Sequence, residues 1–144
     1  MHSLGDNSLL DALIVGAGFG GVYQLKLLRD EGFKVKLVDF ASDYRGVWYW
    51  NRYPGARVDS TVPHHEFSDP ALWNKWNWKQ RFPGSEELRQ YFSFVADKWD
   101  LRKDTEFDTF ISKAEWIDSD HIWIISTSSG KEYRARYFLL NIGF

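Results

Sequence analysis

The chain has 144 residues, which is the size of one domain and enough to bury a hydrophobic core. Its 18 Lys and Arg nearly balance 20 Asp and Glu, and without a basic block this charge pattern argues against nucleic-acid binding. The absence of Cys excludes disulfides and thiolate catalysis and fits a cytoplasmic protein. We expect no membrane association, because no apolar run reaches membrane length.

The start of the chain predicts a βαβ unit of about thirty residues. Residues 12–15 form an apolar run that ends in glycines, which is typical of a buried parallel strand. Residues 18–31 carry apolar side chains at helical spacing, and Gly32 follows as a C-cap. Residues 34–38 predict a second strand that ends immediately before Asp39.

A long loop is expected over residues 40–68, which have no helical period. Loops of this length in compact domains are usually functional or disordered, and the density of Trp, Tyr and Arg favours function. Asp69-Pro70 predicts the start of a helix through residue 79. A second helix is expected from Gly84, with a stripe that should pack on the sheet, formed by Leu88, Tyr91, Phe92, Val95 and Trp99.

The remaining residues change to short strands separated by turn sequences at 118–120 and 128–131. The expected strands are 107–111, 114–117, 122–127 and 132–140. The predicted fold class is therefore α/β: a Rossmann-like half-domain with a parallel sheet and helices, followed by a small antiparallel β-meander. We expect one domain over residues 1–144.

The sequence Gly16-x-Gly18-x-x-Gly21 lies between the first strand and the first helix, as a dinucleotide-binding fingerprint requires. The glycines allow a tight turn, close approach of the pyrophosphate and close helix–strand packing, and the helix N-terminus favours negative charge. Asp39 follows Gly21 by 18 residues and is expected to bind the ribose hydroxyls. An Asp at this point favours FAD or NAD over NADP.

Residues 45–59 combine flat aromatic side chains, arginines and a carboxylate around a Pro54-Gly55 turn. This composition suits a conjugated ring held beside charge, or a loop of core aromatics with surface arginines. The segment resembles the Gly-Gly-Thr/Val-Trp-Tyr-Trp-Asn-Arg-Tyr-Pro-Gly-x-Arg-x-Asp sequence of Baeyer–Villiger monooxygenases, the class B flavin-dependent monooxygenases. The similarity continues through residues 97–102 and 137–143, and so covers nearly the whole chain.

The resemblance implies an N-terminal FAD-binding part of an enzyme that oxygenates a small hydrophobic ketone, with NADPH as hydride donor. The cofactor-binding residues that it implies are Gly16, Gly18, Phe19, Gly20, Gly21, Asp39, Val47, Trp48, Asp59, His65 and Ile111. Of these, Val47 and Trp48 would lie along the flavin, and the Ile111 backbone would contact the adenine. Arg57 and Asp59 would face the reacting edge near the nicotinamide.

The chain departs from the family pattern at several points. Arg45 replaces a glycine, Asn141-Ile142-Gly143 replaces Ala-Thr-Gly, and His65 replaces a tyrosine beside the flavin. A second glycine fingerprint and the NADPH domain, with its active-site arginine, do not follow, and neither does the C-terminal FAD segment. NADPH would therefore act only through a partner. A half-domain leaves apolar surface uncovered, so we expect a homodimer or a complex with another chain.

Two other functions remain open. The chain could be a stand-alone non-redox enzyme of a natural-product pathway, such as a cyclase, dehydratase or isomerase. Its proton transfer would then use Arg57, Asp59, His64 and His65, since His titrates near neutral pH. His64 and His65 could equally be loop residues without a role, and no metal is expected at adjacent histidines without a further spaced ligand. Alternatively, the chain is a non-catalytic module that docks on a larger flavoenzyme.

Overall fold

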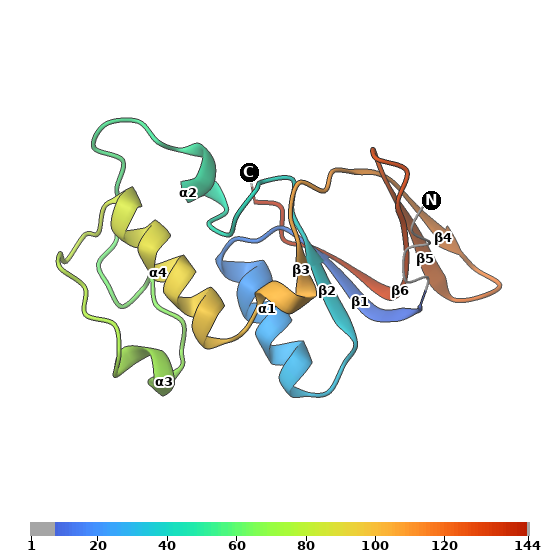
Figure 1. The fold of residues 1–144 in the computed structure, drawn as a ribbon, viewed down its shortest axis with the longest axis horizontal. Coiled ribbons are helices and arrows are strands. Elements are labelled where there is room, and N and C mark those ends of the chain that lie inside the picture. Colours follow the sequence, from blue (N-terminus) through green and yellow to red (C-terminus); the bar gives the residue numbers. More distant parts are fainter. Residues whose placement is uncertain (1–7, 144) are drawn as a thin grey trace.

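The computed structural model describes residues 8–143, which form one six-stranded mixed sheet with helices (Figure 1). The strand order is β3-β2-β1-β6-β5-β4. The central strand β1 (Leu10–Val15) is parallel to β2 (Val35–Val38) on one side and to β6 (Glu132–Leu140) on the other. The short β3 (Thr105–Glu106) extends the parallel part beyond β2.

The meander at the other edge is antiparallel. Strand β4 (Ile111–Ile117) pairs with β5 (Ile122–Thr127), and β5 pairs with β6. Strand β6 therefore joins the two parts of the sheet, since one edge pairs with the meander and the other with β1. This arrangement confirms the predicted fold class, a Rossmann-like parallel sheet followed by an antiparallel meander.

Two apolar clusters lie on opposite faces of the sheet, because successive side chains of a strand point to opposite sides. Ile14 and Leu37 belong to the cluster that includes helix α1 (Phe19–Asp30). Leu13 and Val38 belong to the second cluster, which β5 and β6 complete. The buried parallel strands therefore have apolar residues on both faces, as the continuous apolar runs predict.

Helix α4 (Ser85–Lys98) and Trp99, which directly follows it, bury the apolar stripe that the sequence predicts. The stripe packs on α1, however, and not on the sheet. The ring of Phe92 lies 4.6 Å from that of Phe19 on α1, and Trp99 lies 6.4 Å from Tyr23 on the same helix. Figure 1 accordingly shows α1 between α4 and the strands. The expectation that this stripe packs directly on the sheet was wrong, because aromatic side chains of α1 fill the space between them.

Three other local expectations were wrong. The helix expected to reach residue 79 is the single turn α3 (Pro70–Trp73), capped by Asp69, because Trp76 and Trp78 turn back to pack on Tyr91. The loop over 40–68 contains a short helix, α2 (Val47–Trp50).

The strand expected over 107–111 is absent from the described structure, because Asp108 adopts φ +52° and interrupts it. The chain pairs as β3 before this point, and the short helix η1 (Arg102–Asp104) precedes it. Strand β4 then begins at Ile111, three residues before the expected position.

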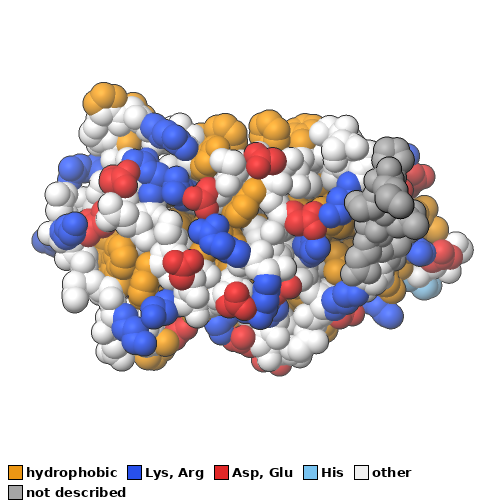
Figure 2. All heavy atoms as spheres, in the orientation of Figure 1, with side chains coloured by type: hydrophobic (Ala, Val, Ile, Leu, Met, Phe, Trp, Pro, Cys, Tyr) orange, Lys and Arg blue, Asp and Glu red, His pale blue; other side chains and the backbone are white. Residues whose placement is uncertain are grey.

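The surface carries acidic and basic side chains interspersed, with hydrophobic side chains along one edge of the face shown in Figure 2. That edge lies over the carboxyl ends of β1 and β2 in the same orientation (Figure 1). Among residues 8–143, no helix is long and apolar enough to span a membrane.

Candidate functional site

The turn between β1 and α1 is closed so tightly that two positions accept only glycine. Gly16 adopts φ +108°, and a Cβ there would lie 2.2 Å from the carbonyl oxygen of Asn141. A Cβ on Gly21 would lie 1.8 Å from the carbonyl oxygen of Gly16. The motif therefore brings the start of α1 against the end of β1, as the fingerprint requires.

The N-terminus of α1 is open to a ligand. Gly18 is the N-cap and provides no side-chain hydrogen bond to the first turn. The first N–H groups of a helix have no intrahelical partner, and the helix dipole gives this end a partial positive charge. An anionic group such as a pyrophosphate fits this end of the helix.

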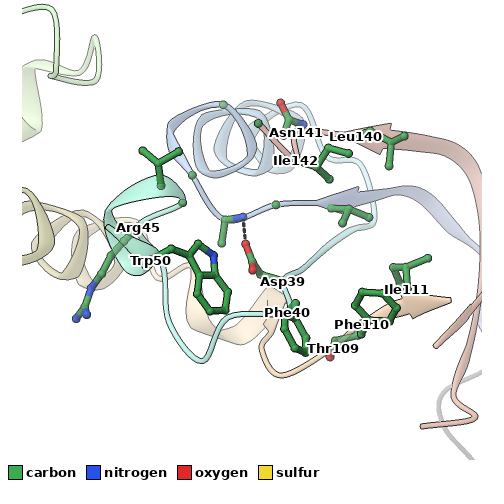
Figure 3. Close-up of a pocket in the computed structure, with 18 of the residues that line it drawn as sticks. Asp39, Phe40, Arg45, Trp50, Thr109, Phe110, Ile111, Leu140, Asn141 and Ile142 are labelled. Atoms are coloured by element: carbon green, nitrogen blue, oxygen red, sulfur yellow. Dashed lines mark hydrogen bonds between the residues drawn. The ribbon is translucent and has the colours of Figure 1, made fainter. Parts of the chain in front are cut away.

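Asp39 lies directly beside the glycine turn. The register that aligns Val15 with Val38 brings the ends of β1 and β2 to the same edge of the sheet. The Asp39 carboxylate accepts a hydrogen bond from the backbone N–H of Ala17 at 2.5 Å (Figure 3). It accepts a second one from the backbone N–H of Ala41 at 2.7 Å. Because each carboxylate oxygen accepts more than one hydrogen bond, Asp39 can still bind ribose hydroxyls.

A cavity of about 850 Å³ opens at this edge. Its size is within the range of cofactor sites. The predicted cofactor-binding residues that line it are Gly16, Gly18, Phe19, Gly20, Asp39, Val47, Trp48 and Ile111. Gly21 lies beneath the turn, where it allows helix and strand to pack.

The four predicted catalytic residues do not line this cavity. Arg57 donates hydrogen bonds to Gln80 Oε1 and to the Phe82 carbonyl, both at 3.1 Å. Arg57 also lines a smaller hollow of about 210 Å³ beside α4. Asp59 is exposed.

The two histidines differ in environment. His64 is exposed, with Nδ1 3.0 Å from the Thr61 carbonyl oxygen. His65 is half-buried, and its ring lies 6.0 Å from that of Phe19 at the cavity wall. Burial lowers the pKa of His65, and the nearby Asp59 opposes this effect. Of the predicted catalytic residues, His65 thus approaches the cavity through Phe19. Within the described part of the chain, no cluster of three His, Asp or Glu could hold a metal.

Arg45 occupies a backbone conformation suited to glycine. Its φ is +137°, and its N–H donates to the Ala17 carbonyl at 3.0 Å. The guanidinium pairs with Asp43 at 2.9 Å, while its buried Nε has no hydrogen-bond partner. The next residue, Gly46, approaches so closely that a Cβ on it would lie 2.8 Å from the Gly18 Cα. The aromatic segment is thereby held against the glycine turn.

Sequence reasoning missed three aromatic residues that line the cavity: Phe40, Trp50 and Phe110. Phe40 directly follows Asp39, and Phe110 directly precedes Ile111. Their adjacency to two predicted cofactor-binding residues was the available signal. Asn141 and Ile142, which depart from the family pattern, also line the cavity.

Comparisons with known proteins agree with this geometry. The NAD(P)-binding Rossmann-like domain matches residues 14–77, which contain the glycine turn and Asp39. FAD-binding monooxygenase VdtE of Byssochlamys spectabilis is 43% identical over 94% of this chain. Cyclopentanone 1,2-monooxygenase of Comamonas sp. is 43% identical over 96% of it. The chain resembles the N-terminal, FAD-binding part of a Baeyer–Villiger monooxygenase.

Solved structures of such monooxygenases share the fold. The oxidized steroid monooxygenase bound to NADP superposes with a TM-score of 0.91 and 37% identity over 94% of this chain. Cyclohexanone monooxygenase from Rhodococcus sp. Phi1 bound to NADP+ has a TM-score of 0.90 and 37% identity over 94%. The chain spans 24% of VdtE, 25% of the Comamonas enzyme and 26% of both solved monooxygenases, about a quarter of each.

Proposed function

We propose that this chain is a single FAD-binding domain of a Baeyer–Villiger-type monooxygenase, which oxygenates a ketone-type small molecule when it is supplied with electrons. One observation carries the proposal. The open N-terminus of α1 and the Asp39 carboxylate lie at one edge of a cavity of about 850 Å³. An anion site and a ribose acceptor, set side by side, match the two polar parts of a dinucleotide.

FAD would supply the redox chemistry once bound, and the residues of this chain would hold and orient it. The first N–H groups of α1 would bind the pyrophosphate, and Asp39 would accept a hydrogen bond from the ribose. Val47 and Trp48, which line the same cavity, would exclude water from the side of the ring. The glycine turn supports this assignment, because side chains at Gly16 and Gly20 would fill the space beside Asn141.

The substrate class rests on the relatives. Cyclopentanone, acetone and cyclohexanone monooxygenases share 38–43% identity with this chain, and their names specify small ketones. We propose that NADPH, supplied through a partner, or another reductant provides the electrons, since two related structures are bound to NADP.

A partner is also supported by exposed apolar residues near the end of β6. Tyr137 is 63% exposed and lies outside the cavity, whereas the neighbouring Leu140 and Ile142, also more than half exposed, line it. We infer that a second copy or another chain covers this surface. Light scattering at micromolar concentration should give a mass above that of the 17.0 kDa monomer. A monomeric mass, in the absence of other chains, would contradict the homodimer.

The test of cofactor binding is the visible absorption spectrum of the full chain after incubation with FAD and desalting. Retained flavin bands are expected, and the Asp39→Ala variant should lose them. Asp30→Ala provides a matched control, because Asp30 pairs with Lys26 at the far end of α1. A parent protein that retains no flavin overturns the proposal. The non-redox alternative would then return, although its candidate residues lie outside the large cavity.

The third hypothesis is supported if the protein retains FAD but oxidises no ketone with NADPH or a chemical reductant. In that case the chain is a non-catalytic module that docks on a larger flavoenzyme. Co-purification with such an enzyme would support the docking module. One chain of a split monooxygenase should instead gain activity when its partner is added.

A further inference from the structure

Three exposed aromatic rings form one side of the cavity, and we call Phe40, Trp50 and Phe110 the aromatic wall. Their side chains are 59%, 59% and 51% exposed, although large apolar side chains usually gain stability from burial. The ring of Phe40 is stacked on Trp50 at 6.1 Å and meets Phe110 edge to face at 5.5 Å. Figure 3 shows the three rings following one another on the same side of Asp39.

Backbone hydrogen bonds hold the two phenylalanines together. The N–H of Thr109 donates to the Asp39 carbonyl at 2.9 Å, and the N–H of Asp108 donates to the Ala41 carbonyl at 3.0 Å. Phe40 lies between the two acceptors on one segment, and Phe110 directly follows the two donors on the other. The two hydrogen bonds therefore bring the phenylalanines together. Two hydrogen bonds between distant segments thus position a pair of rings that remain exposed to solvent.

We propose that the aromatic wall stacks on the adenine base of the bound dinucleotide. This inference rests on the proposed function and adds the residues that would hold the base. The pyrophosphate belongs at the N-terminus of α1 and the ribose at Asp39, so the base continues beyond Asp39, away from the glycine turn. The side chains directly beyond Asp39 are Phe40 and Phe110.

The chemistry of the wall matches that of a purine. A purine presents a flat π face, and aromatic side chains stack on such faces with little dependence on the hydrogen-bonding pattern of the base. Covering the wall with a base would also remove three apolar rings from water. The competing occupant is the isoalloxazine ring at the opposite end of FAD. That ring would lie beyond the pyrophosphate on the other side of the glycine turn if Asp39 binds the ribose.

The experiment compares ADP, FMN and FAD as ligands of the full chain by isothermal titration calorimetry. ADP carries the base, ribose and diphosphate, whereas FMN carries only the flavin end. Phe40→Ala and Phe110→Ala should each weaken ADP and FAD binding by about tenfold, the lower part of the range for loss of one stacked base. FMN binding should not change, and Phe110→Tyr should restore ADP binding.

The matched control is Phe33→Ala, which removes a phenylalanine of similar exposure, 47%, from the turn between α1 and β2, outside the cavity. Its ADP and FAD affinities should equal those of the parent. Thermal melts should show that the Phe40 and Phe110 variants remain folded, because both side chains are more than half exposed.

The outcomes separate this inference from the proposed function. Binding of FAD and ADP that Phe40→Ala and Phe110→Ala leave unchanged overturns the aromatic wall while the flavin site stands. Weakened FMN binding with unchanged ADP binding also overturns it, because the rings would then face the flavin. If the parent binds ADP but not FAD, and the two variants weaken ADP, the wall stands and the proposed function fails. A parent that binds neither ligand overturns both.

Discussion

The carboxylate of Asp39 accepts a hydrogen bond from the backbone N–H of Ala17 at 2.5 Å. This bond joins the end of β2 to the turn between β1 and α1, and a second bond from Ala41 fixes the other carboxylate oxygen. Asp39 thus has a structural role beside its expected role in binding a ribose. Its substitution should affect both stability and ligand binding, and the two effects can be measured separately.

Asp39→Ala should lower the free energy of unfolding by about 1–3 kcal/mol, because two backbone N–H groups lose their acceptor. Asp39→Asn should recover part of this loss, since its amide oxygen still accepts one of the bonds. Urea titration of both variants measures the difference. An Asp39→Ala protein as stable as the parent would show that the carboxylate does not hold the turn.

Gly21→Ala should prevent the chain from folding stably, because the new Cβ would lie 1.8 Å from the Gly16 carbonyl oxygen. Neither atom can move without displacing β1 or α1. Gly84→Ala is the matched control at the start of α4, where φ is −76° and the nearest atom to a Cβ is 3.7 Å away. Its stability should change by less than about 1 kcal/mol. Circular dichroism melts of the two variants check this contrast, and equal melting temperatures would contradict it.

Arg45→Gly should stabilise the chain by about 1 kcal/mol. A side chain at φ +137° costs about 1–3 kcal/mol. The partly buried ion pair that Arg45 makes with Asp43 is offset by the desolvation of a buried Nε that has no hydrogen-bond partner. The control is Arg52→Gly, which lies outside the residues with positive φ and should be neutral or destabilising. Denaturant midpoints report the sign. Destabilisation by Arg45→Gly would mean that the Asp43 contact outweighs the backbone strain.

Glu106 should make stability depend on pH in the acid range. Burial raises its pKa, but hydrogen bonds from Lys131, Lys36 and Tyr133 outweigh this effect and lower the pKa to about 2. The stabilisation is therefore fully present above the unfolded value of 4.5 and is lost as the pH falls toward 2. The gap in unfolding free energy between parent and Glu106→Gln should be about 1–3 kcal/mol at pH 6 and should shrink below pH 4.5.

Urea titrations at pH 6, 4 and 3 measure this gap. The control is Glu115→Gln on β4, an exposed carboxylate that pairs only with its strand neighbour Lys113 among the ion pairs of the described chain. A gap between parent and Glu106→Gln that stays constant over this range would show that the interactions of Glu106 do not differ between the folded and unfolded chain.

The features that the sequence predicts well depend on local patterns. The apolar run before Gly16 and the helical spacing after Gly18 specify a strand and a helix, and the meander follows from alternating apolar residues between turn sequences. The missed features depend on contacts between distant segments. Helix α3 stops early because Trp76 and Trp78 pack on Tyr91. Phe40 lies beside Phe110 because the chain returns to the same edge of the sheet after 69 intervening residues.

The same limit applies to the candidate site. The glycine turn and Asp39 are adjacent in a βαβ unit, so their spacing alone predicts that they meet. The position of Arg57 and His64 depends on the path of an irregular loop, which no periodic pattern encodes. Arg45 stands where the family pattern has glycine, and its backbone angle in the structure, φ +137°, disfavours any side chain.

The contact between Gly16 and Asn141 has a consequence for how the protein is made. The turn that follows the first strand is closed by a residue near the end of the described chain, which also donates its backbone N–H to Val15 at 2.8 Å. This contact can therefore form only after the ribosome has released the residues up to Asn141. Proteolytic removal of β6 should remove this contact, so that nucleotide retention would report the integrity of the chain between Val15 and Asn141.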